Sequence, residues 1–250
     1  MIPSKLQFGS LTVHIYGLII AIAIYVGWFI ARKRAKLYKI PEKLFDDPIL
    51  ISPLLFGIIG GRLYHVASIW QYYQNNLSQM FMVWNGGLGI WGALIGIFGG
   101  FYFIARRKHI KFLSLLDLIS PSLIFGQALG RIGNYINQEA FGPPTNLPWG
   151  VFIDEAHRPP EFQQFSRFHP TFFYEAVLDL IFFAIILYLT KKFKIPGQLF
   201  AAYLILYALG RFFVEFFRTD TWTVSGFKIA HLLSITAIFI GIYILAKVRD

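Results

Sequence analysis

Long apolar runs alternate with short polar segments along the whole sequence. Each run has about 20 residues, which is the length a helix needs to cross the hydrocarbon core of a bilayer. The runs cover roughly 11–31, 48–69, 83–105, 113–133, 170–190, 196–217 and 229–246. The pattern predicts an all-α polytopic membrane protein with seven transmembrane helices, numbered here as spans one to seven.

The basic residues gather between the apolar runs and indicate an orientation. The chain carries 23 Lys and Arg against 13 Asp and Glu. Fifteen of the basic residues follow spans one, three, five and seven, whereas five lie on the opposite side. The positive-inside rule therefore places the N-terminus outside and the C-terminus in the cytoplasm. Because the charge clusters in membrane loops, we expect no nucleic-acid partner.

One connection is much longer than the others. Residues 134–169, between spans four and five, include the proline-rich and aromatic stretch FGPPTNLPW. We expect them to form a small extracytoplasmic head with a few short strands. The chain as a whole, 1–250, is expected to be a single integral membrane domain into which this head is inserted.

Cysteine and histidine usage argues against a metal centre. The sequence has no cysteine, so the fold uses no disulfide and no thiolate ligand. Its six histidines have no HExxH or similar spacing. We therefore expect no metal and no other cofactor.

Three arginines interrupt the apolar runs. Arg62, Arg131 and Arg211 each follow a glycine and fall late in spans that run outward. A charge beside lipid costs about 2.5–3.5 kcal/mol even on the lenient insertion scale, so such a group has a partner or a function. All three are expected near the outer leaflet, where Arg62 either contributes to function or pairs with Glu175 or Glu215.

Other polar residues open spans on the same side. His14 and Tyr16 begin span one, and His169 and Glu175 begin span five. His14 is either functional or an interfacial histidine with a structural partner. At the opposite end of span four, Asp117 is expected to satisfy backbone groups freed by Pro121.

The segment 130–142 reads GRIGNYINQEAFG and concentrates the polar groups of span four. Its glycines let the backbone approach a ligand, and its amides supply donors and acceptors in a fixed array. Together with the arginine, they predict an anion site at the membrane edge. The glycine-rich stretch GGLGIWGALIGIFGG of span three predicts either close helix packing or passage of a lipid chain.

The segment 130–142 resembles the signature G-R-x-G-N-[FY]-x-N-x-E-x-x-G of the prolipoprotein diacylglyceryl transferases at every fixed position. The stretches HIYG (14–17), HPTFFYE (169–175) and YALGRFFVEFFR (207–218) are also similar to that family. The resemblance implies transfer of the diacylglyceryl group of phosphatidylglycerol to the lipobox cysteine of prolipoprotein signal peptides. The products would be a thioether and glycerol 1-phosphate. The resemblance further implies a multi-pass protein of the bacterial cytoplasmic (inner) membrane, with its active site toward the outer leaflet.

The resemblance and the residue types together assign roles. The candidate catalytic residues are Arg131, Arg211, His14, Tyr16 and Glu139. The candidate substrate-binding residues are Arg131, Asn134, Asn137, Gly142, Arg62, Tyr207 and Arg211. Structural support is assigned to Glu215, Arg218, His169, Tyr174 and Glu175. The i,i+4 spacing of Tyr207, Arg211 and Glu215 places these three on one helical face.

One position departs from the family pattern. Trp91 stands where the family commonly has a histidine, the often-proposed base for the cysteine thiol. Indole can donate a hydrogen bond but cannot accept a proton. Either His14 or Glu139 takes that role, or arginines lower the thiol pKa enough that no base is needed, which we favour.

Two other classes of protein remain as alternatives. A phospholipid or anion transporter would also place arginines inside its spans, and it should show paired broken helices in inverted halves. A non-catalytic envelope scaffold would have no use for three intramembrane arginines.

Overall fold

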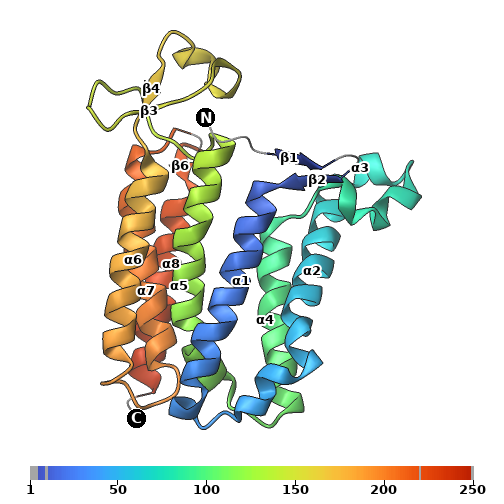
Figure 1. Cartoon of the computed structure of the whole chain (residues 1–250), viewed down its shortest axis with the longest axis vertical. Helices are drawn as coiled ribbons and strands as arrows, with labels where there is room; N and C mark the ends of the chain where they lie inside the picture. The colour runs from blue at the N-terminus through green and yellow to red at the C-terminus, as the bar shows by residue number, and fades with distance from the viewer. Residues whose placement is uncertain (1–4, 9–10, 220, 249–250) are drawn as a thin grey trace. The chain divides into compact units, whose positions relative to one another are not determined.

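The computed structural model describes residues 5–8, 11–219 and 221–248, and most of them are helical (Figure 1). The long helices are α1 (Ile15–Arg34), α2 (Ser52–Ser68), α4 (Ile90–Arg107), α5 (Phe112–Asn137), α6 (Thr171–Leu189), α7 (Gln198–Val214) and α8 (Ile229–Lys247). α3 (Trp70–Tyr73) is a single turn. The chain divides into two compact units: residues 1–33 with 117–250, and residues 34–116.

The strands are short and pair locally. They are β1 (Lys5–Phe8), β2 (Leu11–His14), β3 (Val151–Phe152), β4 (Arg167–Phe168), β5 (Thr223–Val224) and β6 (Phe227–Lys228). Each makes a two-stranded antiparallel ladder with its neighbour in sequence: β1 with β2, β3 with β4, and β5 with β6.

Six of the described helical segments are long and apolar enough to cross a membrane. They contain α1, α2, α5, α6, α7 and α8. α4 has 18 residues and ends in Arg106 and Arg107, and it is not among the six. The chain is therefore a polytopic, mainly α-helical membrane protein.

Three of the expected span boundaries are wrong. Span one was expected from residue 11, but Leu11–His14 pairs with β1 as a strand and the helix begins at Ile15. Span three was expected from residue 83, but Gly86 and Gly87 have φ of +83° and +80°, so α4 begins only at Ile90. α5 continues to Asn137, one turn beyond the expected start of the long connection.

In the unit 34–116, α2 and α4 pack through glycines. A side chain at Gly60 would strike the backbone of Gly92 and Gly96, and one at Gly100 would strike Pro53. Of the two predictions for the glycine-rich stretch, close helix packing is therefore the one the structure shows. At the start of α2, the carboxylate of Asp47 accepts a hydrogen bond from the Ile49 N–H at 2.9 Å and one from Lys108. These bonds hold the pKa of Asp47 below its ordinary value.

In the other unit, α7 packs against both α6 and α8 (Figure 1). α5 is fixed to α1 by Ser122 Oγ, which donates to the Gly27 carbonyl at 2.7 Å. α5 is also fixed to the start of α7 by Asp117, whose two oxygens accept the backbone N–H groups of Gly197 and Phe200 at 2.7 Å each. Asp117 was expected to satisfy backbone groups freed by Pro121; the two N–H groups described here lie at the start of α7.

The connection between α5 and α6 has its own small core. Phe141, Ile153, Phe168 and Phe172 form a buried apolar cluster. The chain leaves α5 through Gln138, which has a positive φ of 53°. The side chain of Gln138 exchanges two hydrogen bonds with Asp154, at 2.5 and 2.6 Å. The end of α5, which carries the polar segment, is thereby anchored to a folded element.

Candidate anion site

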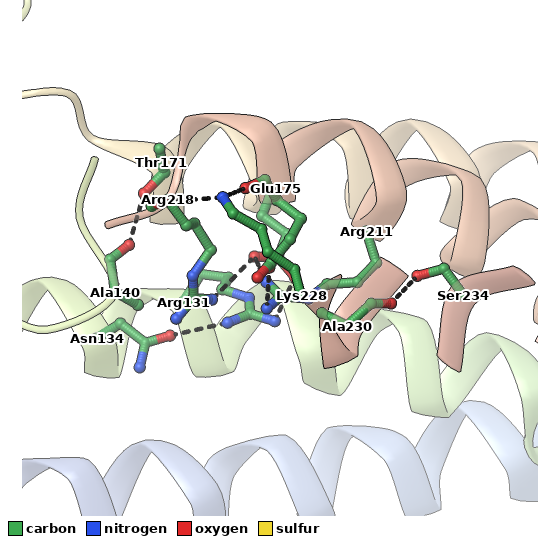
Figure 2. Close-up of polar contacts among 11 residues, drawn as sticks. Arg131, Asn134, Ala140, Thr171, Glu175, Arg211, Arg218, Lys228, Ala230 and Ser234 are labelled. Carbon is green, nitrogen blue, oxygen red and sulfur yellow. Dashed lines mark hydrogen bonds and ion pairs between the residues drawn. The ribbon is translucent and has the colours of Figure 1, made fainter. Parts of the chain in front are cut away.

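Three arginines converge on one carboxylate in the unit formed by 1–33 and 117–250 (Figure 2). Glu175, in the first turns of α6, is 2% exposed. Its Oε1 lies 2.5 Å from Arg131 Nη2, contributed by α5. Its Oε2 lies 3.2 Å from Arg211 Nη1 of α7 and 3.9 Å from Arg218 Nη1. The sequence assigned Glu175 to structural support; the structure places it at the centre of the cluster.

A second glutamate fixes the arginine of α7. Glu215, 1% exposed, lies in the short helix η8 (Glu215–Phe217), which follows α7 directly. Its Oε2 forms an ion pair with Arg211 Nη2 at 2.6 Å. Lys228 Nζ donates to the backbone carbonyls of Glu215 and Arg218 at 2.7 and 3.2 Å. The turn that presents Arg211 and Arg218 is thus held at both its side chains and its backbone.

Amides extend the cluster along the end of α5. Arg131 Nη1 donates to Asn134 Oδ1 at 3.2 Å. Asn134 and Asn137 both donate to Oε1 of the exposed Glu139, at 3.0 and 3.3 Å. The Nε–H of Arg131 is buried and has no hydrogen-bond partner among the described residues. The guanidinium therefore keeps one donor that the described part of the chain leaves unpaired.

Asp179 also belongs to the cluster, although it is not among the site residues predicted from the sequence. It lies one turn after Glu175 in α6 and is 2% exposed. It interacts electrostatically with Glu175, Arg131 and Arg211, while its Oδ2 accepts no hydrogen bond within the described chain. An acidic residue four positions after Glu175 in an otherwise apolar helix was the signal that could have identified it.

Two tyrosines adjoin the arginines. Tyr207, partly buried on α7, interacts electrostatically with Glu175, Arg131 and Arg211, and its ring stacks on that of Tyr203. Tyr16, at the start of α1, interacts with Arg131 in the same way. A Cβ at Gly133 would strike the Tyr16 ring, so this glycine allows α5 and Tyr16 to meet.

The remaining predicted residues have other surroundings. His14 ends β2 and is exposed. Gly142 is buried, and a side chain there would strike Phe217, His169 and Thr171. Close packing therefore explains why a glycine occupies this position. The ring of His169 contacts the hydroxyl of Tyr174 at 3.1 Å, and its backbone pairs with Gly142 and Pro143.

Arg62 belongs to the other unit and has a different environment. Its Nε donates to the Met80 carbonyl at 2.9 Å, and Nη1 donates to those of Gly86 and Gly87 at 2.6 and 3.0 Å. Nη2 donates to the Gln79 carbonyl. Arg62, 6% exposed, therefore holds the segment between α3 and α4 by its backbone. Of the two alternatives expected for Arg62, function or structure, these contacts within the unit 34–116 favour structure.

The chemistry of the cluster follows from its charges. Three guanidinium groups and the three carboxyl groups of Glu175, Asp179 and Glu215 occupy one region. Guanidinium groups bind carboxylate and phosphate oxygens with the same planar fork. No group of three or more His, Asp or Glu in the described residues could hold a metal ion. The cluster is suited to an oxyanion with two or more oxygens.

Comparison with known proteins identifies the family. The family model described as prolipoprotein diacylglyceryl transferase matches residues 3–247. A protein of Thermosynechococcus vestitus is 37% identical over 95% of this chain and 89% of its own length. A protein of Finegoldia magna is 38% identical over 94% and 90%. One of Thermotoga maritima is 40% identical over 94% and 80%. Each of these relatives is named phosphatidylglycerol–prolipoprotein diacylglyceryl transferase. On this match over nearly its whole length, the chain belongs to the prolipoprotein diacylglyceryl transferase family.

Proposed function

We propose that this protein transfers the diacylglyceryl group of phosphatidylglycerol to the lipobox cysteine of prolipoproteins. The observation that carries the proposal is the convergence of Arg131, Arg211 and Arg218 on a single carboxylate in a chain of this family. The relatives' name specifies the two substrates. The transporter alternative has no such support from the family.

The reaction requires stabilisation of a leaving phosphate. The cysteine sulfur attacks the glycerol carbon that bears the phosphate; the new C–S bond forms as the C–O bond breaks. The electron pair of that bond goes to the phosphate oxygen, and the thiol proton goes to water or to the released glycerol 1-phosphate. Arg131 and Arg211 neutralise the charge that develops on the phosphate, and their planar forks fix its orientation.

Residues around the arginines orient the substrate. Asn134 is hydrogen-bonded both to Arg131 and to Glu139, so it couples the guanidinium to the exposed end of α5. Tyr16 and Tyr207 lie near Arg131. A tyrosine hydroxyl can donate a hydrogen bond to a phosphate oxygen. Asn137 contributes through Glu139. We assign Gly142 a packing role, with no contact to substrate.

The thiol proton does not require a dedicated base in this proposal. A free thiol has a pKa near 8.5, and neighbouring cations lower it by one or more units. The guanidinium cluster supplies such cations. His14 and Glu139, both exposed, are the alternatives for a proton acceptor.

The topology completes the proposal. All seven long helices span the bacterial inner membrane, with α4 as the seventh. The N-terminus and the connection between α5 and α6 face outward, and the C-terminus faces the cytoplasm. The site lies toward the outer leaflet, where the signal peptides are presented.

Cysteine labelling tests this topology. Because the native chain has no cysteine, single cysteines at Lys192 and His157 are labelled without background. We expect an impermeant thiol reagent to label the His157 variant in sealed cells and to spare the Lys192 variant. The reverse pattern would overturn the orientation.

The reaction itself is tested by mass. Purified protein is incubated with phosphatidylglycerol and a peptide that carries a lipobox cysteine, and the peptide is then weighed. We expect the mass of one diacylglyceryl group to be added to the cysteine. An unchanged mass, with protein that is folded and lipid that is accessible, would contradict the proposed function.

A further inference from the structure

We propose that Glu175 is an internal competitor for the arginines, holding them in place of the phosphate when no substrate is bound and displacing the released phosphate after reaction. This inference rests on the proposed function, because it concerns the same guanidinium groups. Glu175 thereby becomes a residue that sets the affinity of the site for anions and the release of product.

The geometry of Glu175 supports this role. Its two carboxylate oxygens form ion pairs with the guanidinium groups of three arginines. Arg131 lies on α5, Arg211 lies on α7, and Arg218 follows η8. A phosphodiester offers the same guanidiniums two equivalent oxygens, which accept hydrogen bonds in the same fork geometry. Figure 2 shows the carboxylate among these arginines. It therefore holds donors that a substrate phosphate would need.

The guanidinium donors of the cluster are already bound to carboxylates. Asp179 and Glu215 are buried in the same region as Glu175. Nη2 of Arg131 and both Nη atoms of Arg211 are paired with Glu175 and Glu215. A phosphate that uses these donors must take them over from a carboxylate, and Glu175 is paired with the largest number of arginines.

This exchange has a consequence for turnover. A site of unopposed arginines would bind the product phosphate as strongly as the substrate phosphate and would release it slowly. With Glu175 present, its carboxylate recovers the arginines as the product leaves. Removing the charge of Glu175 should therefore tighten anion binding and slow product release.

Glycerol 1-phosphate binding to purified protein in detergent provides the test. We expect Glu175→Gln to bind glycerol 1-phosphate about tenfold more tightly than wild type, a change of about 1.4 kcal/mol. Single-turnover transfer should fall less than steady-state turnover, because release is the step that slows. A merely structural role would give the opposite sign, since a disordered clamp binds the anion more weakly.

Glu215→Gln is the matched control. It removes the same formal charge from the same cluster, but the ion pair of Glu215 is with Arg211, whereas Glu175 is paired with Arg131, Arg211 and Arg218. We expect it to tighten binding clearly less than Glu175→Gln does. Equal tightening by both variants would mean that net charge alone sets the affinity, and the proposed competition would be wrong.

Two further variants separate the possible failures. If Glu175→Gln does not fold, Glu175→Asp replaces it. The shorter side chain keeps the charge but lies farther from the arginines. We again expect tighter binding of glycerol 1-phosphate. Unchanged or weaker binding by the folded variant overturns the competition. Arg131→Ala tests the clamp itself: if wild type and Arg131→Ala bind glycerol 1-phosphate equally, the proposed function of the site fails instead.

Discussion

Two Gly-Arg pairs with the same local sequence pattern have opposite surroundings in this protein. Arg131, after Gly130, faces the carboxylate of Glu175, and its Nε–H has no partner among the residues that the structure describes. Arg62, after Gly61, donates hydrogen bonds to four backbone carbonyls. Both are membrane-helix arginines with buried guanidinium atoms, yet within the described ranges only Arg131 has an anionic partner.

The kind of partner decides what each arginine can do. Backbone carbonyls fixed in a turn cannot leave the guanidinium without unfolding the segment that carries them, so the donors of Arg62 are committed to structure. A carboxylate on a side chain can move and can be replaced by another oxyanion. The acceptors of a charged residue in a membrane helix therefore decide whether it is available for function or committed to structure.

The largest expected effect is at Arg131. We expect Arg131→Ala to lower the transfer rate by about 10³-fold, since one donor to a developing oxyanion contributes 10²–10³-fold. Arg131→Lys should lose on the order of 100-fold, because an ammonium keeps the charge but lacks the fork. Transfer to a lipobox peptide, measured by mass spectrometry on equally folded protein, gives both values. Near-normal turnover of Arg131→Lys would show that the clamp is only a point charge.

A smaller effect is expected at Gly133. Its Cβ would strike the Tyr16 ring, and overpacking of this kind costs about 1–3 kcal/mol. We expect Gly133→Ala to lower the unfolding temperature and to reduce transfer about tenfold, because Tyr16 is displaced from Arg131. Thermal unfolding and the peptide assay measure the two effects.

Gly130→Ala is the matched control on the same helix. A Cβ at Gly130 meets no atom within 4 Å, and alanine is the better helix former. This variant should keep its activity and its unfolding temperature. A loss equal to that of Gly133→Ala would mean that the contact with Tyr16 is not the cause.

At Arg62 the effect should fall on stability. Arg62→Lys leaves some of the four carbonyls without donors, at a cost of about 1–3 kcal/mol. We expect faster proteolysis in 77–89 and a lower unfolding temperature, with transfer per folded molecule changed by less than about threefold. A rise in the KM for phosphatidylglycerol, without loss of stability, would instead show that Arg62 binds substrate.

The smallest effect is expected at Trp91, which opens α4 and is partly buried. If no base is needed, Trp91→Phe should change the transfer rate by less than about twofold, as substitutions away from special features do. The rate is measured at several pH values. A loss comparable to that of Arg131→Ala, in folded protein, would assign chemistry to position 91.

The membrane helices were largely predictable because each needs about 20 apolar residues in sequence. Positions where short-range geometry overrides hydropathy were not predicted. Leu11–His14 is apolar enough to continue a helix but pairs with β1. The positive φ values of Gly86 and Gly87 delay α4, and hydropathy carries no information about such backbone angles.

In the candidate site, too, some residues could be predicted from the sequence and others could not. Arg131 and Arg211 were identified because a charge in an apolar run is expensive, and this signal is local. The central place of Glu175 and the burial of Asp179 depend on how α5, α6 and α7 pack, which the sequence does not specify. For the same reason, the sequence could not tell Arg62 from Arg131: their acceptors lie on segments remote along the chain.

Solid-state NMR on arginine-labelled protein tests the central contrast most directly. The dipolar contact between the ³¹P of bound glycerol 1-phosphate and guanidinium ¹⁵N is measured in wild type, Arg131→Lys and Arg62→Lys. We expect the wild-type contact to persist in Arg62→Lys and to be strongly reduced in Arg131→Lys. An unchanged contact in Arg131→Lys, or its loss in folded Arg62→Lys, would contradict the assignment of the phosphate to the carboxylate-paired arginines.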